Sequence, residues 1–118
     1  MADDCFWLAF DELVANSEII IDRPKGTKHP RYDFIYEYDY GYLSNTTSPD
    51  GEGIDVWLGS LNEHRLIAAI CTVDLIKRDS EIKLLIDCNE DEINAIYAWH
   101  NNSEHMKGLL IKRSQMKR

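Results

Sequence analysis

A chain of 118 residues is long enough for one domain with its own core, and 44% of its residues are hydrophobic, so composition excludes a wholly disordered protein. The formal net charge of −8 argues against nucleic acid as a partner, because binding to phosphate backbones needs clustered cations. An acidic chain with grouped carboxylates favours divalent cations that bring in an anionic substrate. We expect a single domain over residues 1–118.

The cysteine content and the first residues of the chain indicate the cellular compartment in which the protein is expected. The three cysteines show no CxxC spacing, which indicates neither a disulfide framework nor a zinc ribbon. The first four residues are acidic and carry no secretory n-region, and the longest apolar run, residues 66–71, is too short to span a bilayer. The sequence therefore predicts a soluble, cytoplasmic protein without a membrane partner.

Hydrophobic periodicity predicts a helix over residues 3–15, where apolar side chains recur at helical spacing. Asn89 with Glu92 three positions later resembles a capping box and predicts a second helix that ends at Asn101-Asn102. Between and after these helices, short apolar runs predict strands, and the polar stretch 41–53 predicts a long loop. The expected strands cover residues 18–22, 31–38, 54–58, 65–75, 81–87 and 108–112. Short strands flanked by helices indicate a mainly β (α+β) fold, as a small barrel or a curled antiparallel sheet.

The stretch 50–56 holds the most informative group of acids. Asp50 and Glu52 share one side of an extended segment, whereas Asp55 has the opposite parity. Two intervening glycines permit a turn that could bring all three carboxylates together, where hard oxygen ligands suit Mg²⁺, Mn²⁺ or Ca²⁺. An EF-hand loop is excluded, because an apolar residue stands at its twelfth position. The alternative is a solvated Asp-Gly turn between strands.

Two further charged clusters bear on that choice. Arg31 and Asp33 share one face of an expected strand, and Asp79, Glu81 and Lys83 alternate along another. Each cluster alone is typical of a solvent-facing strand surface. Three such clusters in one small domain, mixing acids with Arg and Lys, favour a cavity for phosphate and metal.

The order of these motifs resembles the soluble inorganic pyrophosphatases of the single-barrel type, over residues 18 to about 87. The segments that carry the resemblance are Asp22-Arg23-Pro24, Arg31-Tyr32-Asp33, Tyr36-Glu37-Tyr38-Asp39-Tyr40-Gly41-Tyr42, Asp50-Gly51-Glu52-Gly53-Ile54-Asp55-Val56, and the later Asp79, Glu81 and Lys83. The resemblance implies a small five-stranded OB-like β-barrel with flanking helices. It also implies Mg²⁺-dependent hydrolysis of pyrophosphate to two phosphates by a metal-activated water, with Mn²⁺ as an alternative ion.

The resemblance also implies roles for individual residues. Metal ligands would be Asp50, Asp55 and Glu81 for the tightest ions, with Asp79, Asp22 and Asp33 helping to hold the others. Glu52 would be the base that takes the proton of the attacking water. Phosphate would be bound by Arg31, Tyr36 and Lys83, of which Tyr36 and Lys83 also count as catalytic.

Departures from the family pattern leave alternatives open. The family hairpin before Tyr36, with an arginine that grips phosphate, is missing, and Asn101-Asn102 stands where the family has Tyr-Lys. These losses favour a non-catalytic metal- or phosphate-binding module, or a hydrolase of a larger phosphoanhydride. The physiological substrate, the number of metals and the formation of homo-oligomers stay open.

Overall fold

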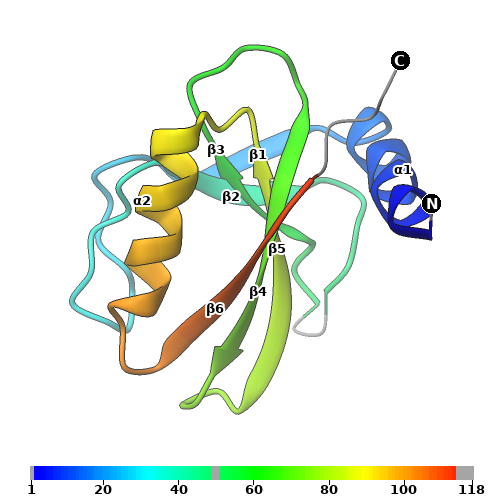
Figure 1. Ribbon diagram of the computed structural model, residues 1–118. Helices are drawn as coiled ribbons and strands as arrows, with labels where there is room; N and C mark the ends of the chain where they lie inside the picture. Colours follow the sequence, from blue (N-terminus) through cyan, green and yellow to red (C-terminus); the bar gives the residue numbers. More distant parts are fainter. Residues whose placement is uncertain (1, 49–50, 114–118) are drawn as a thin grey trace.

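The computed structural model describes residues 2–48 and 51–113 as a six-stranded sheet with two helices (Figure 1). The strand order across the sheet is β1-β2-β3-β5-β4-β6. In chain order the elements are α1 (Ala2–Ala15), β1 (Ile19–Arg23), β2 (Asp39–Leu43), β3 (Asp55–Leu58), β4 (Leu66–Asp74), β5 (Asp79–Ile86), α2 (Glu90–Asn101) and β6 (Met106–Lys112). The mixed α+β class expected from the sequence is therefore present.

The expected five-stranded barrel is wrong. Within the described residues, β1 pairs only with β2 and β6 only with β4, so the sheet stays open with these two strands at its edges. Neighbouring strands are antiparallel except β3 and β5, which run parallel. Closure requires the two edge strands to pair with each other. A count of predicted strands carries no information about that pairing.

The strand expected over residues 31–38 is also wrong. That segment forms bends, with one isolated bridge between Lys28 and Ile35, and the regular strand begins only at Asp39. The alternating aromatic residues pack instead against α2: the ring centroids of Phe34 and Tyr36 lie 5.5 and 5.3 Å from that of Trp99. The alternation of aromatic residues therefore reflects packing against α2 and not a strand. The strand β2 includes residues 41–43, which were expected to begin the long loop.

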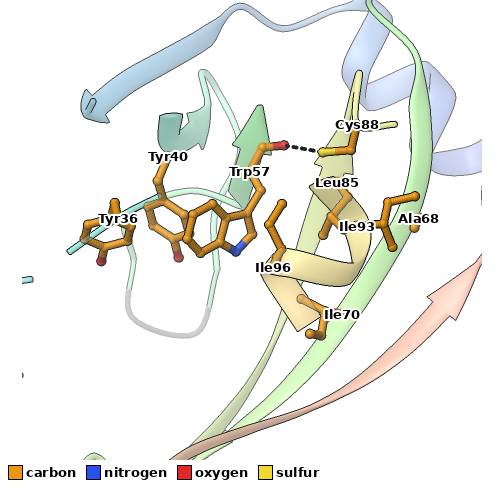
Figure 2. Close-up of a cluster of buried hydrophobic side chains, with 9 residues drawn as sticks. All are labelled: Tyr36, Tyr40, Trp57, Ala68, Ile70, Leu85, Cys88, Ile93 and Ile96. Atoms are coloured by element: carbon orange, nitrogen blue, oxygen red, sulfur yellow. Dashed lines mark hydrogen bonds between the residues drawn. The ribbon is translucent and has the colours of Figure 1, made fainter. Parts of the chain in front are cut away.

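Alternation along the central strands divides the core between the two faces of the sheet. On one face α2 covers a cluster around Trp57, which is fully buried, with Leu85 of β5 and Ile70 of β4 beside it (Figure 2). Isoleucines 93 and 96 of α2 point into this cluster. The capping box predicted at Asn89 and Glu92 is confirmed and fixes the start of α2. The row of aromatic rings from Trp57 to Tyr36 leads away from this core.

The opposite face carries a second cluster, which includes Trp7 and Val14 of α1 together with Val56, Leu84 and Ala69 of the central strands. At Gly41 of β2 the backbone of β1 comes very close. A Cβ atom at this position would overlap the Ile20 carbonyl, so the position requires glycine. No helix among the described residues is long and apolar enough to cross a membrane.

Candidate functional site

A cavity of about 470 Å³ opens beside the Trp57 cluster, on the same face of the sheet as α2. Strand parity explains the position of its polar residues. Trp57 and Asp55 of β3 point to one face, and so do Leu85 and Lys83 of β5, because each pair is two residues apart. The apolar members of both strands lie under α2, whereas the polar members project beyond it into the cavity.

Most of the predicted site residues line this cavity. They are Asp22, Arg31, Tyr36, Glu52, Asp55, Glu81 and Lys83. Asp33 does not: its side chain is 97% exposed and lies 3.3 Å from Lys28. Asp79 is outside the lining and lies 3.8 Å from Lys77 instead. Asp50 falls outside the described residues. The structure thus brings together residues from β1, β3, β5 and the loops, which are far apart in the chain.

Lys83 is the central cation of the cavity. Its ammonium donates a hydrogen bond of 2.7 Å to Asp55 Oδ2 and another of 2.7 Å to the hydroxyl of Tyr40, and Glu81 Oε1 lies 3.5 Å away. Only a tenth of the Lys83 side chain is exposed. Burial, with the nearby Asp55 charge, raises the pKa of Tyr40 well above its ordinary value, so the phenol stays protonated. One ammonium therefore compensates two partly buried carboxylates.

A second cation lies on the β1 side. Arg23 donates a hydrogen bond of 2.6 Å from Nη1 to the hydroxyl of Tyr36. Burial opposes the charge of Arg23, but the hydrogen bond and the charges of neighbouring groups outweigh it and raise the pKa of the guanidinium. Burial has the opposite effect on the phenol of Tyr36 and raises its pKa, although the hydrogen bond and charge of Arg23 oppose that shift. Tyr36 is therefore a neutral phenol whose oxygen accepts a hydrogen bond from the Arg23 guanidinium.

Two histidines in the cavity wall are neutral at pH 7. Burial, and then the charges of Arg23 and Lys83, lower the pKa of His29 to about 4. Burial, and then Lys83, lower the pKa of His100 to about 3. His100 Nε2 accepts a hydrogen bond of 3.1 Å from the Trp57 indole, so its proton is on Nδ1. Neither imidazole supplies positive charge to the cavity.

The segment before β2 forms one wall and is tied to the far end of the sheet. The Tyr32 hydroxyl donates to Asp74 Oδ1 of β4 at 3.2 Å, and its ring stacks on His105 with centroids 6.0 Å apart. Asp74 also accepts two backbone N–H bonds of 2.9 Å from its own turn. These contacts fix the wall that carries His29 and Arg31.

The donor atoms of the cavity suit a hard divalent cation. Asp22, Glu52, Asp55 and Glu81 offer carboxylate oxygens, the ligand type that Mg²⁺ and Mn²⁺ prefer. Among residues 2–48 and 51–113, however, no three His, Cys, Asp or Glu side chains are grouped as a metal centre. Mg²⁺ commonly uses one or two carboxylates together with substrate phosphates. The described residues fit that arrangement, and the ligand triad with Asp50 stays a prediction.

Sequence reasoning missed several cavity residues, notably Arg23, His29, Tyr40, Trp99 and His100. For Tyr40 a signal existed, since it shares the alternation of Tyr36 and Tyr42. The aromatic and histidine residues of α2 reach the cavity from the end of an otherwise apolar helical face, which the sequence pattern assigns to the core.

Comparison with known proteins gives a likeness at the level of the fold. No family model and no curated protein matches the chain. Among solved structures, the inorganic pyrophosphatase of the pathogenic bacterium Helicobacter pylori is similar over 82% of this chain and 83% of that chain, with a TM-score of 0.56 and 13% sequence identity. The described chain therefore resembles an inorganic pyrophosphatase in its fold.

Proposed function

We propose that this protein hydrolyses a phosphoanhydride, with inorganic pyrophosphate as the substrate and Mg²⁺ as the cofactor. The observation that carries the proposal is the cavity itself, where Lys83, Arg31 and Tyr36 lie with the carboxylates of Asp55 and Glu81 on one face of a pyrophosphatase-like fold. Cations bind and neutralise phosphate, whereas carboxylates hold divalent ions and accept protons. Such a mixed lining serves both needs.

The chain's own residues divide the work. Lys83 and Tyr36 bind phosphate oxygens, and Arg31 contacts the substrate from the loop wall. Asp55, Glu81 and Asp22 would hold Mg²⁺, which when bound supplies an acidified water and neutralises the leaving phosphate. Glu52 accepts a proton from the attacking water, as an exposed carboxylate at the cavity wall can do.

The test separates the base from a metal ligand. We expect Glu52→Gln to lower kcat by about 100-fold with pyrophosphate and Mg²⁺, because it removes a positioned proton acceptor. Mg²⁺ binding, measured by titration calorimetry, should persist in this variant and weaken in Asp55→Asn. A wild-type rate in Glu52→Gln would refute the assigned role of this residue.

A specific observation favours a second candidate, a phosphate-binding module without catalysis. Asn101 stands where the resemblance implies a phosphate ligand, but its side-chain amide hydrogen-bonds to backbone groups of the fold. Nδ2 donates to the carbonyls of Tyr97 and Gly108 at 3.0 Å each, and Oδ1 accepts from the Gly108 N–H at 3.1 Å. One phosphate contact is therefore lost, and phosphate release by the wild-type protein distinguishes the two functions.

A further inference from the structure

We propose that Arg23 is a phosphate-binding residue of this cavity, and that a bulge in β1 is the device that places it there. The identity of the ligand rests on the proposed function. The position of Arg23 follows from the register of the sheet, its contacts and its burial.

The register of β1 against β2 shifts by one residue immediately before Arg23. Ile21 pairs with Gly41, but the next pair is Arg23 with Tyr40, so Asp22 is the extra residue of a bulge. Without this bulge Asp22 would oppose Tyr40, and Arg23 would point to the other face of the sheet. The insertion therefore turns the guanidinium to the face that carries Tyr40, and both residues line the cavity.

A tyrosine holds the guanidinium in one orientation. Nη1 is 2.6 Å from the hydroxyl of Tyr36, and the guanidinium carbon lies 5.6 Å from the centre of the same ring. An arginine has five N–H donors in a rigid fork, and this hydrogen bond uses one of them. The Tyr36 ring is itself buried and packs against Trp57 and Trp99, so its position is fixed by the core.

Among the residues that the structure describes, Arg23 lacks the carboxylate partner that a partly buried arginine normally has. Within the described part of the chain it forms no ion pair with a carboxylate. Arg113, which is also partly buried, has both outer nitrogens on the carboxylate of Asp11, at 2.8 and 2.7 Å. A half-buried guanidinium that faces a cavity with free donors is suited to a bound anion.

Phosphate is the anion that fits best. A guanidinium fork matches two oxygens of a phosphate, and Lys83 of β5 supplies a second cation to the same cavity. Arg23 on β1 and Lys83 on β5 approach from the two sides of Tyr40, which pairs with Arg23 and hydrogen-bonds to Lys83. A diphosphate has an anionic group for each of these cations.

The experiment measures binding directly, by titration calorimetry of the full chain with pyrophosphate plus Mg²⁺ and with inorganic phosphate. We expect Arg23→Gln to weaken pyrophosphate binding by about 10- to 100-fold, the loss of a charge-assisted hydrogen bond. Arg23→Lys should fall between, because it keeps the charge and loses the fork. Arg65→Gln removes the same charge from an exposed residue outside the cavity and should stay within about twofold of wild type.

A second set of variants keeps the test valid if Arg23→Gln fails to fold. Tyr36→Phe removes the hydroxyl that orients the guanidinium together with the proposed phosphate contact of that hydroxyl, and should weaken binding. Combined with Arg23→Lys, it should weaken binding by less than the product of the two single effects, since each variant already disturbs the contact between Tyr36 and Arg23. Any of three results would overturn the inference. These are a loss of affinity in the double variant equal to the product of the two single losses, unchanged affinity in both Arg23→Lys and Tyr36→Phe, or no binding of pyrophosphate by wild type.

The outcomes for Arg23 and for catalysis can be told apart. If wild type binds pyrophosphate through Arg23 but releases no phosphate, the proposed hydrolysis fails and the role of Arg23 stands. If wild type hydrolyses pyrophosphate and Arg23→Gln leaves both affinity and KM unchanged, the role of Arg23 fails and the proposed hydrolysis stands.

Discussion

Lys83 and Asp55 stand directly opposite each other in the one parallel strand pair of the described sheet, and their charged atoms are 2.7 Å apart. The pair lies at the boundary between the apolar core and the cavity, and Glu81 Oε1 lies 3.5 Å from the same ammonium. The lysine therefore acts as an internal counter-ion for two carboxylates. Its removal would leave like charges close together with little solvent to screen them.

We predict that Lys83→Met lowers the free energy of unfolding by about 3 kcal/mol, since it removes the cation paired with the partly buried carboxylate of Asp55. Added Mg²⁺ should recover part of the loss in melting temperature by supplying positive charge to the same oxygens. The matched control is Lys112→Met. Lys112 lies at the same 2.7 Å from Glu90, but both side chains are about half exposed or more, so the change should be under about 1 kcal/mol. Equal losses in the two variants would contradict the counter-ion role.

His100 predicts a pH dependence of stability. In the folded protein its pKa is lowered to about 3, against 6.5 for an ordinary histidine, so the unfolded chain takes up a proton first as pH falls. The stability from the neutral imidazole is complete above pH 6.5. It is lost at up to about 1.4 kcal/mol per pH unit as pH falls from 6.5 toward 3.

Urea unfolding at pH 7.5 and pH 5.0 measures this effect. His100→Gln keeps an acceptor for the Trp57 indole and cannot titrate, so the loss between the two pH values should be smaller than in wild type. The lowered pKa of His29 acts in the same direction and leaves part of the dependence in this variant. An identical pH dependence in both proteins would show that His100 is not held neutral.

Asn101 is expected to contribute to stability and not to substrate affinity. Its side chain ties the end of α2 to Gly108 of β6 through bonds of 3.0 and 3.1 Å. We predict that Asn101→Ala costs about 2 kcal/mol in the free energy of unfolding and leaves the KM for pyrophosphate unchanged. Asn102, exposed at the helix end, is the control. A raised KM in Asn101→Ala with unaltered stability would return this residue to the phosphate site.

Local patterns in the sequence correctly predicted the parts of the fold that depend on near neighbours. The apolar spacing of α1 and the Asn89–Glu92 capping box are local, and both helices form where expected. The aromatic alternation from Tyr32 to Tyr38 wrongly predicted a strand. The aromatic side chains of this segment pack against Trp99 of a helix that is distant in the sequence, and the segment does not form a regular strand. The number of predicted strands likewise does not show whether the sheet closes into a barrel, because closure depends on whether the two edge strands pair.

The site shows the same division between local and distant effects. Glu81 and Lys83 could be grouped because their alternation along one strand is visible in the sequence, and their side chains do share one face. The sequence pattern groups Asp55 with Asp50 and Glu52 instead, and the position of Asp55 beside Lys83 is visible only in the pairing of β3 with β5. Arg23 could not be placed, because parity along β1 is reversed by the bulge at Asp22, and only the pairing with Tyr40 shows it. Asp33 is grouped with Arg31 through an expected strand that does not form, and Asp79 shares the alternation of Glu81 and Lys83, but both residues fall outside the cavity lining.

Phosphate release from pyrophosphate in the presence of Mg²⁺, measured with wild type and Asp55→Asn purified side by side, tests whether the cavity hydrolyses this substrate. We predict steady release of two phosphates per pyrophosphate by wild type, and a rate reduced at least about 100-fold in Asp55→Asn at a similar melting temperature. Tripolyphosphate and a nucleoside triphosphate in parallel reactions measure the preference for pyrophosphate. Binding of Mg²⁺ and pyrophosphate by wild type without any phosphate release would contradict the proposed hydrolysis.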